Sequence, residues 1–483
     1  MKIIKLILLL LLSSQILFAN TYYVSNSGNN DDDGSIASPF KTISYLLNIV
    51  QAGDSGLVRG GVYILEQTTK ISGTQTEKIY IGRFQNEHVI LAGTGNLSNG
   101  SMFRLKHNWY IFEGLEFKDG AAGMRISSNA SHDSIVNCSS HNHYYDGFYL
   151  TGGASNINLV NCDAYDMFDS GTDGGNADGF SINGQDYDLG SGNKMTGCRA
   201  FNNSDDGFDV WKASYPVEIT NCYSFNNGNH SGDGNGFKLG VNKTSDDKHV
   251  LKNCVAWGNK QNGFDYNDNT LPQTLYNCTA YNNFRNYKFS NIGGGPTIDD
   301  IQNCISITTT EDDVLLQTII DNNTNSWNLV SANQANVVSD NFISTDDIVI
   351  SGQRNIDGTI PDSDFLKLKN SSIFIDSGVD VGLPYNGVAP DFGAFETPTT
   401  IKVRNVETNV YNIYPNPATN FICINTSKST YNYYIIDVFG SVVKLLRSNN
   451  KSQIINIKNL QKGIYFLIID TKQGNAVKKF IKQ

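Results

Sequence analysis

Residues 197–210 read Gly-Cys-Arg-Ala-Phe-Asn-Asn-Ser-Asp-Asp-Gly-Phe-Asp-Val, and this stretch decides the fold. Its first word, Asn-Cys or Gly-Cys, recurs at intervals of 24, 36, 24, 32, 24 and 26 residues, at Cys138, Cys162, Cys198, Cys222, Cys254, Cys278 and Cys304. Its second word, Asp/Asn-Gly-Phe, begins at Asp146, Asp178, Asp206, Asn235 and Asn262, with Asn286-Tyr-Lys-Phe as a sixth, altered copy. Such a period is typical of a solenoid, and short strands between Gly and Asn turns indicate parallel β-coils about 4.8 Å apart.

The alternation of side chains along each predicted strand gives a map of the coils. Successive side chains point to opposite faces, so a core-facing Phe places the next residue outside. The inward positions are then all apolar, at Phe148, Leu150, Phe180, Ile182, Phe208, Val210, Phe237 and Leu239. The outward positions are Tyr149, Ser181, Asp209, Lys238 and Asp265. We therefore expect an all-β, right-handed parallel β-helix on which Asp178, Asp205, Asp206, Asp209 and Lys238 converge.

The first 19 residues are predicted to be a secretory signal peptide. Lys2 and Lys5 precede an apolar run over residues 6–12, and Leu17-Phe18-Ala19 fits a cleavage site. The apolar run is too short to span a membrane, and no later stretch could do so. We expect a secreted, extracellular or cell-surface protein that has no membrane span and acts as a monomer.

Residues 20–396 are predicted to form the β-helix domain. Ser38-Pro39 suits the start of a helix whose apolar face ends before Gly53, and this face comprises Phe40, Ile43, Leu46, Leu47 and Val50. An amphipathic helix would cover the open edge of the first coil. Coils are expected from about Leu57 to about Phe395, with the turn-rich residues 374–395 closing the other end.

Residues 397–410 are predicted to be a polar linker, and residues 411–483 a small β-sandwich with strands near 433–438, 453–457 and 464–469. The words Ile413-Tyr-Pro-Asn-Pro417, Lys462-Gly-Ile-Tyr-Phe466 and Lys478-Lys-Phe-Ile-Lys482 resemble the C-terminal sorting domain of the type IX secretion system. The resemblance implies that the type IX machinery is a partner and that the domain is removed on release or surface attachment. A carbohydrate-binding sandwich is the alternative, although the aromatic residues do not gather on one face.

Charge is distributed unevenly along the chain. Residues 411–483 carry 10 Lys and Arg against 2 Asp and Glu, whereas residues 1–410 carry 26 against 45. This acidic body would repel nucleic acid and anionic membranes, and it suits multivalent cations. A polyanionic substrate would therefore need a bound cation to mediate its contact with the protein.

The phased cysteines are predicted to form an inward ladder of small apolar side chains, a common role for buried Cys. Disulfides between neighbouring coils are the alternative, because stacking brings the Cα atoms within bonding range. No Cys-x-x-Cys pair or Cys/His cluster indicates zinc.

Asp178, Asp205, Asp206 and Asp209 are candidate ligands of Ca²⁺. Calcium takes six to eight oxygen ligands, largely carboxylates, carbonyls and water. Three of these aspartates come from one coil and Asp178 from the coil before it. Four carboxylates so close together would repel one another unless a divalent cation neutralised them. Two alternatives remain: turn-forming residues without a metal, or a calcium ion that only joins the coils.

Lys238 is the candidate catalytic base. It lies one coil after Asp209 in the same outward column and follows a glycine-rich segment that leaves room for a ligand. A carboxylate substrate bound to calcium would have an acidified α-hydrogen, which a nearby amine could remove. A free lysine has a pKa of about 10.4, and we expect the metal and burial to lower it, so that activity rises into the alkaline range. A solvated surface charge is the alternative.

These residues resemble the site of the family-nine polysaccharide lyases, which are pectate-lyase-like β-helices. The likeness rests on Asp178, on Asp205-Asp206-Gly-Phe-Asp209 and on Gly236-Phe-Lys238, and it extends from Tyr22-Tyr-Val-Ser25 to Pro390-Asp-Phe-Gly393. It implies that four aspartates bind one Ca²⁺ and that Lys238 abstracts the C5 proton of a galacturonate in polygalacturonate or a related pectin, with β-elimination of the 4-O-glycosidic bond. Lys212 and Arg199 are candidate uronate contacts, and each could instead be a surface or loop charge.

Three rival functions remain. The polymer could be rhamnogalacturonan or another uronate polymer. A β-helix glycoside hydrolase would need two carboxylates and a water path, and it would leave Lys238 without a role. A non-catalytic surface glycan-binding β-helix would keep its function in a Lys238→Ala variant.

Overall fold

The computed structural model describes residues 19–64, 67–93, 101–185, 188–241, 248–290, 299–316, 324–329, 341–398, 411–426, 432–437, 442–447, 452–471 and 474–483. The predicted signal peptide (1–19) and linker (397–410) lie almost entirely outside these residues. The chain forms two compact units, one that ends at Thr397 and one that begins at Pro398. Within the described residues, no helix has the length and apolar character needed to cross a membrane.

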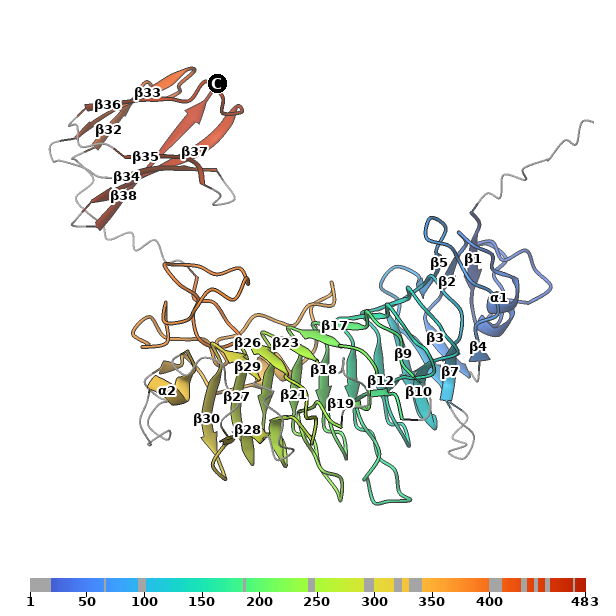
Figure 1. Ribbon diagram of the computed structural model, residues 1–483. Helices are drawn as coiled ribbons and strands as arrows, with labels where there is room; N and C mark the ends of the chain where they lie inside the picture. Colours follow the sequence, from blue (N-terminus) through green and yellow to red (C-terminus); the bar gives the residue numbers. More distant parts are fainter. Residues whose placement is uncertain are drawn as a thin grey trace, which may run out of the picture. The chain divides into compact units, whose positions relative to one another are not determined.

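Three parallel sheets run along the first unit, and each coil from β2 onward contributes one strand to each sheet (Figure 1). Sheet 1 contains β1 (Thr21–Val24), β2 (Ser55–Val58), β5 (Ile79–Arg83), β8 (Tyr110–Glu113), β11 (Ser134–Val136), β14 (Asn158–Val160), β17 (Lys194–Thr196), β20 (Glu218–Thr220), β23 (Val250–Lys252), β26 (Thr274–Tyr276) and β29 (Asp300–Gln302). Sheet 2 contains β3 (Gly61–Ile64), β6 (Val89–Ala92), β9 (Leu115–Lys118), β12 (Ser139–His141), β15 (Asp163–Tyr165), β18 (Arg199–Phe201), β21 (Tyr223–Phe225), β24 (Val255–Trp257), β27 (Thr279–Asn283) and β30 (Ile305–Thr309). Sheet 3 contains β4 (Gln67–Thr68), β7 (Ser101–Leu105), β10 (Ala122–Ile126), β13 (Phe148–Leu150), β16 (Phe180–Asn183), β19 (Phe208–Trp211), β22 (Phe237–Lys238), β25 (Asn262–Asp265), β28 (Arg285–Ser290) and β31 (Val314–Leu316).

The phenylalanines of the Gly-Phe words form one continuous stack inside the coils. The stack comprises Phe148, Phe180, Phe208, Phe237 and Phe264, which the register of sheet 3 pairs in this order. Successive ring centroids lie 5.3, 4.7, 4.8 and 5.0 Å apart. All five rings are fully buried. The predicted parallel β-helix and its inward column are therefore confirmed.

The phased cysteines form a second buried column. The seven are unpaired thiols inside the coils, and Cys423 of the second unit is also free. The predicted inward ladder is thus confirmed, and the disulfide alternative is not realised. Each thiol instead lies close to backbone carbonyls; the Sγ of Cys198, for example, lies 3.5 Å from the carbonyl oxygen of Leu159. Burial raises the pKa of Cys138 to about 12, which makes this thiol a poor nucleophile at neutral pH.

Helix α1 (Ile43–Ile49) covers the N-terminal end of the coils, but it begins later than predicted (Figure 1). Thr42, rather than Ser38, is the N-cap, and its Oγ1 accepts a hydrogen bond from the backbone N–H three residues later. Phe40 forms a β-bridge with Val24, which holds the residues after Ser38 in an extended conformation. The predicted apolar face is confirmed by the burial of Phe40, Ile43, Leu46, Leu47 and Val50.

The C-terminal end of this unit differs from the prediction that coils continue to Phe395. In the described residues the ladder of sheet 3 ends at β31, and helix α2 (Ser326–Leu329) lies at that end of the coils (Figure 1). The ring of Trp327 in α2 lies 5.2 Å from the ring of Tyr287, between centroids. Helix α2 therefore covers the C-terminal end of the coils, whereas residues 374–395 lie along their side.

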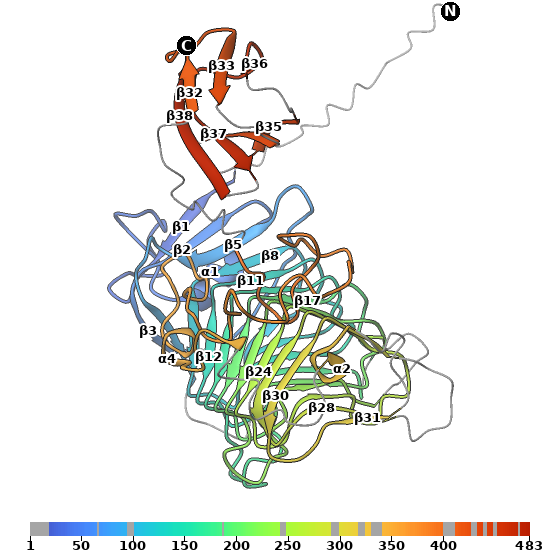
Figure 2. The ribbon, with the colours of Figure 1, turned by 90° about the vertical axis from the view of Figure 1, so that its left-hand side faces the viewer.

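Residues 341–397, which we call the strap, run along the outer face of sheet 2. Asp347, just before the short helix α4 (Ile348–Ser351), accepts a hydrogen bond from Trp257 Nε1 at 2.6 Å, and Gly393 N–H donates to the carbonyl of Asn303 at 2.7 Å. Helix α4 can be followed in Figure 2, and the carbonyl of its Ile350 accepts a hydrogen bond from Arg199 Nη1 of β18 at 2.9 Å. The strap covers a second apolar cluster on the outside of the coils, which includes Phe225, Trp257, Ile307, Phe342, Phe365, Phe374 and Phe392. These outward aromatic residues require a cover, and the strap provides it.

The second unit consists of two antiparallel sheets, as predicted for a small β-sandwich. One sheet contains β32 (Tyr411–Tyr414), β33 (Phe421–Thr426) and β36 (Ser452–Asn456). The other contains β35 (Val442–Arg447), β34 (Asn432–Ile436), β37 (Gly463–Thr471) and β38 (Gly474–Lys482). Ile422 and Ile455 of the first sheet share one buried cluster with Tyr433 and Leu467 of the second.

Asp133 is a fully buried carboxyl beside the first residue of β11, and it gives a pH-dependent stability prediction. Its Oδ1 accepts a hydrogen bond from Tyr110 N–H at 2.7 Å, and among the described residues its Oδ2 has no partner. Burial raises the pKa of Asp133 to about 8. The folded protein therefore holds a proton that the unfolded chain releases above about pH 4, so stability falls as the pH rises between these values.

Asp133→Asn keeps the acceptor for Tyr110 and removes the charge. We expect its gain in the free energy of unfolding to be near zero at about pH 4 and about 5 kcal/mol at about pH 9. Urea unfolding of both proteins at the two pH values measures the gain. A gain of equal size at both values would contradict the assigned cause.

Candidate active site

The candidate site lies on the outer face of sheet 3, where β16, β19 and β22 are neighbours. Register pairs Ser181 with Asp209 and Asp209 with Lys238, so the base candidate stands one strand from Asp209 in the same outward column. A cleft of about 580 Å³ opens here, and its lining includes Asp178, Asp205, Asp209, Trp211, Asp233 and Lys238. The predicted map of the outward face is thus borne out in geometry.

The glycine of each Asp/Asn-Gly-Phe word is required by space. A Cβ on Gly207 would lie 2.0 Å from Ser224 Oγ and 2.9 Å from the carbonyl oxygen of Gly236. Only glycine therefore fits at this point of the coil. This close approach explains why glycine recurs at this position of each word.

A ladder of Asp and Asn side chains joins the residues that begin these words. The backbone N–H of Asp178 donates to Asp146 Oδ1 at 3.3 Å, and that of Asp206 donates to Asp178 Oδ1 at 3.0 Å. Asn235 N–H donates to Asp206 Oδ1 at 2.6 Å, and Asn262 N–H donates to Asn235 Oδ1 at 3.1 Å. Each Oδ1 thus satisfies the backbone of the next coil, and the second oxygen of Asp206 faces Lys238.

Lys238 is a nearly buried cation among carboxylates. Its Nζ lies 2.8 Å from Asp206 Oδ2, 3.5 Å from Asp209 Oδ2 and 3.7 Å from Asp233 Oδ2. The Lys238 side chain is 11 % exposed, so its contacts with the buried Asp206 and Asp209 are screened little by solvent, whereas the side chain of Asp233 is 70 % exposed. The ring of Trp211 lies 5.8 Å from the same Nζ and forms one wall around the amine.

Two overlapping groups of carboxylates lie close enough to hold a cation. Oxygens of Asp178, Asp206 and Asp209 lie within 4.8 Å of one another, and so do oxygens of Asp205, Asp206 and Asp233. Asp209 Oδ1 is buried and has no hydrogen-bond partner among the described residues. An all-oxygen donor set with an unpaired buried carboxylate oxygen fits the coordination preferences of Ca²⁺. The four predicted ligands therefore meet at Asp206, and Asp233 joins them.

Burial and mutual repulsion raise the pKa values of these aspartates. Burial raises the pKa of Asp178 well above its usual range, and the nearby charges of Asp209 and Asp205 raise it further. Burial and Asp206 raise the pKa of Asp205 to about 8. Burial raises the pKa of Asp209 to about 7 against the attraction of Lys238. Burial lowers the pKa of Lys238, but Asp206, Asp209 and Asp178 together raise it above its ordinary value, so the amine is held protonated while the carboxylates remain unneutralised.

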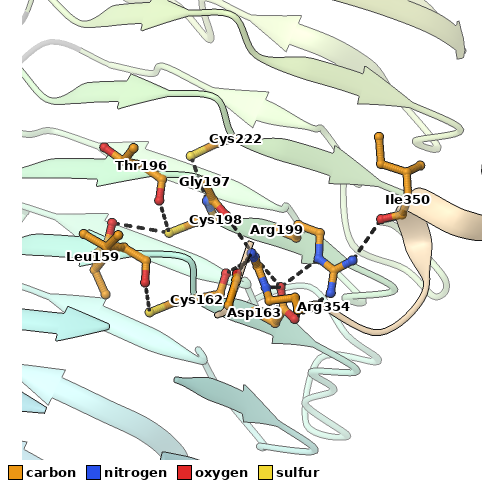
Figure 3. Close-up of polar contacts among 12 residues, drawn as sticks. Leu159, Cys162, Asp163, Thr196, Gly197, Cys198, Arg199, Cys222, Ile350 and Arg354 are labelled. Atoms are coloured by element: carbon orange, nitrogen blue, oxygen red, sulfur yellow. Dashed lines mark hydrogen bonds and ion pairs between the residues drawn. The ribbon is translucent and has the colours of Figure 1, made fainter. Parts of the chain in front are cut away.

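Arg199 does not reach the cleft, and its predicted contact with a uronate is wrong. It begins β18 in sheet 2, and its side chain is 3 % exposed. Its Nε and Nη2 donate to Asp163 at 2.9 and 2.7 Å, and its Nη1 donates to the carbonyls of Ile350 and Gly352 at 2.9 and 2.8 Å (Figure 3). Arg354 of the strap also binds Asp163. Arg199 thus joins the coils to the strap.

Arg199→Met is expected to lower the free energy of unfolding by about 3 kcal/mol, because it breaks a buried ion pair and leaves two strap carbonyls without a donor. The KM of the folded protein for its substrate should not change. Denaturant unfolding and steady-state kinetics on the same sample measure both. A raised KM at unchanged stability would return Arg199 to the substrate site.

Lys212 lies just beyond the cleft. It follows β19 directly, and its Nζ is 5.4 Å from the ring centroid of Trp211, a residue that lines the cleft. The long side chain of Lys212 can cover the edge of the cleft at Trp211. Its role as a uronate contact stays a prediction.

Three residues of the cleft were not singled out from the sequence. Asp233 precedes Lys238 by five residues and donates its N–H to Asp205 Oδ1 at 2.7 Å. Trp211 ends β19 and donates Nε1–H to Gln185 Oε1 at 2.8 Å. Arg125 lies one coil before Tyr149 in the outward column. The column could have been extended to it, but the Asp-Gly-Phe word is absent from that coil.

Comparison with known proteins identifies both units. Residues 22–310 match the family described as "Pel9A-like, right handed beta helix region", and residues 412–483 match the "Secretion system C-terminal sorting domain". "Pectate lyase L" of Dickeya dadantii (strain 3937) is 34 % identical over 304 residues, which cover 61 % of this chain and 68 % of that protein. "Pectate lyase PEL9" of Emericella nidulans is 28 % identical over 375 residues, which cover 69 % and 88 %.

Solved structures agree with these sequence matches. The crystal structure of pectate lyase Pel9A superposes with a TM-score of 0.71 at 30 % identity, over 78 % of this chain and 96 % of that one. A rhamnogalacturonan lyase superposes with a TM-score of 0.64 at 25 % identity, over 73 % and 97 %. Both resemblances predicted from sequence words are thereby confirmed. The chain belongs to the Pel9A-like right-handed β-helix family of polysaccharide lyases and ends in a sorting domain of the type IX secretion system.

Proposed function

We propose that this protein is a secreted, calcium-dependent lyase that cleaves polygalacturonate by β-elimination, with Lys238 as the base. One observation carries the proposal: the Lys238 amine lies 2.8 Å from Asp206 and 3.5 Å from Asp209, within a cleft lined by carboxylates. A base thus stands beside residues that can hold a substrate carboxylate through a cation. The names of the relatives, which are pectate lyases, support the choice of polymer.

Asp178, Asp205, Asp206 and Asp209 would hold the calcium ion, with Asp233 at the edge of the group. The bound ion supplies a positive charge that neutralises the uronate carboxylate and stabilises charge that develops on it. With their charge taken up by the ion, the aspartates no longer hold the pKa of Lys238 so high, and the amine can lose its proton to solvent before substrate reacts.

The reaction balances without an added oxidant or water. Lys238 Nζ accepts the proton from C5 of the uronate, and the C5–H electron pair forms the C4=C5 double bond as the C4–O electron pair departs with the leaving oxygen. The leaving oxygen then takes a proton from solvent or from the ammonium group. Lys212 stays a candidate contact for a uronate carboxylate near this position.

Product analysis tests the proposal. The purified protein, incubated with polygalacturonate and Ca²⁺, should release products with an unsaturated end that absorbs ultraviolet light. New reducing ends without that absorbance would mean hydrolysis and would overturn the proposal. Rhamnogalacturonan I belongs in the same assay as the second candidate, because a rhamnogalacturonan lyase is among the structural neighbours. Faster cleavage of that polymer would change the substrate but not the chemistry.

The sorting domain indicates export, and we propose that the catalytic unit acts outside the cell or on its surface. The acidic β-helix unit would not attract a polyanionic polymer without the cation. Export through the predicted signal peptide and the type IX machinery would bring the protein to a polymer outside the cell. Deletion of residues 411–483 should leave an active protein inside the cell envelope of a host that has this secretion system.

A further inference from the structure

We infer that the cleft continues from Asp209 over the N-terminal coils, and that Arg125 and Arg104 bind the free carboxylates of two consecutive uronate units there. The inference rests on the proposed function and specifies the polymer that suits it. It follows from the outward column of sheet 3, from a second cavity, and from the charges that face this cavity.

The outward column continues past the candidate site without a break. Register pairs Asp209 with Ser181, Ser181 with Tyr149, Tyr149 with Arg125 and Arg125 with Arg104. Strands lie about 4.8 Å apart, so Arg125 and Arg104 stand about 14 and 19 Å from Asp209 along the coils. A pyranose unit has about the length of one coil spacing. An extended polymer along this column therefore places about one sugar on each coil.

A second cavity of about 800 Å³ adjoins the first. Arg104, Lys106, Arg125 and Tyr215 are among its lining residues, and Arg125 lines both cavities. Tyr215 is 42 % exposed at this cavity, and an exposed aromatic ring offers an apolar face on which a sugar ring can pack. The two cavities thus form one groove that begins at the aspartates and ends at the arginines.

Two further acidic residues line the groove near these basic side chains, Asp146 in the first cavity and Asp188 in the second. Among the described residues, no carboxylate lies within ion-pair distance of Arg104, Lys106 or Arg125. By contrast, Lys288, farther along the same column, pairs with Asp265 at 3.3 Å. The guanidinium of Arg125 lies 5.1 Å from the ring centroid of Tyr149, which holds it in place. A held guanidinium binds carboxylates through two parallel hydrogen bonds.

The spacing selects a particular polymer. Arg125 and Arg104 are on adjacent coils, so the carboxylates that they bind belong to adjacent sugars rather than to uronates separated by a neutral sugar. A methyl ester has no charge and cannot form the bidentate contact. The groove should therefore favour unesterified, contiguous uronate over both esterified pectin and an alternating backbone.

The test is a double variant, Arg104→Gln with Arg125→Gln, assayed with Ca²⁺ on four substrates: polygalacturonate, methyl-esterified pectin, digalacturonate and a long oligogalacturonate. We expect kcat/KM on the polymer and on the long oligomer to fall about 100-fold, about tenfold for each arginine, mainly through KM. The dimer, too short to reach Arg125 from Asp209, should react at the wild-type rate. The preference for polygalacturonate over esterified pectin should fall by a similar factor.

Lys194→Gln is the matched control, since it removes an exposed cation from sheet 1 and should leave every rate unchanged. A double variant with wild-type kcat/KM on the polymer would overturn the inference. So would an equal loss on the dimer and the long oligomer, or an unchanged preference between the two polymers. If the wild-type protein cleaves no uronate polymer at all, the proposed function itself has failed.

Discussion

Replacing Lys238 with alanine is expected to lower kcat on a uronate polymer by about three orders of magnitude, the effect of removing a general base. The physical reason is position: among the described residues, the Lys238 Nζ is the amine that contacts both Asp206 and Asp209. The reaction is followed by the ultraviolet absorbance of the unsaturated product at saturating Ca²⁺ and substrate. The fold should be retained, because the Phe stack under the site is unchanged.

Lys288→Ala is the control for this variant. Lys288 lies in the same outward column two coils farther on, and its Nζ contacts Asp265 instead of the candidate ligands. Its removal should change kcat less than about threefold. Wild-type turnover in the Lys238→Ala protein would assign the proton transfer to another group, and retained polymer binding without any turnover in the wild type would favour the glycan-binding alternative.

Removing divalent metal is expected to abolish activity and to lower the melting temperature, and adding Ca²⁺ should restore both. The carboxylates of Asp178, Asp205 and Asp209 repel one another in the folded state, and a bound cation relieves this repulsion. At a Ca²⁺ concentration a hundredfold above its Kd, binding adds about 2.7 kcal/mol to the free energy of unfolding. Thermal unfolding in chelator and in Ca²⁺, with turnover on the same samples, measures the two effects.

The affinity for calcium should depend on pH in a stated direction. Burial raises the pKa of Asp205 to about 8 and that of Asp209 to about 7, so protons compete with the cation below these values. Calorimetric titration should therefore give a larger Kd for Ca²⁺ at about pH 6 than at about pH 8.5. Activity should also rise with pH, since Lys238 must lose its proton to act as a base.

The Asp209→Asn variant tests whether Asp209 is a ligand of the metal ion or only one of several acidic residues in the cleft. It keeps the size of the side chain and removes one ligand charge, so Ca²⁺ binding and turnover should both fall at least tenfold. Asp265→Asn, in the same column two coils on, should leave Ca²⁺ binding unchanged, because Asp265 pairs with Lys288. Full activity of metal-stripped protein would show that the acidic group serves only to form turns.

The sequence predicted those parts of the molecule that repeat. Phe208 recurs at one position of successive coils, so its inward stack and the outward column beside it could both be derived from alternation. The meeting of Asp178 with Asp206 followed from the same stacking, although the carboxylates were spread over two overlapping groups rather than one. Periodicity alone therefore placed the base beside its acidic neighbours.

The parts that do not repeat could not be derived in this way. Arg199 contacts Ile350, which is 151 residues away in the chain, and no pattern links the two positions. Thr42 begins α1 because Phe40 pairs with Val24, a tertiary contact that outweighs the local signal of Ser38-Pro39. Arg125 was missed for a related reason, since its coil has lost the word by which the other coils were recognised.

The strap has a consequence for how the coils come apart. A solenoid whose rungs touch only their neighbours can fray from either end, one rung at a time. Here the strap forms hydrogen bonds with coils as far apart as those of Asp163 and Asn303, through Arg354 and Gly393. Unfolding of one inner coil would therefore disrupt several contacts with the strap at once. The middle coils should unfold as one cooperative unit, while the first coils can still unfold locally.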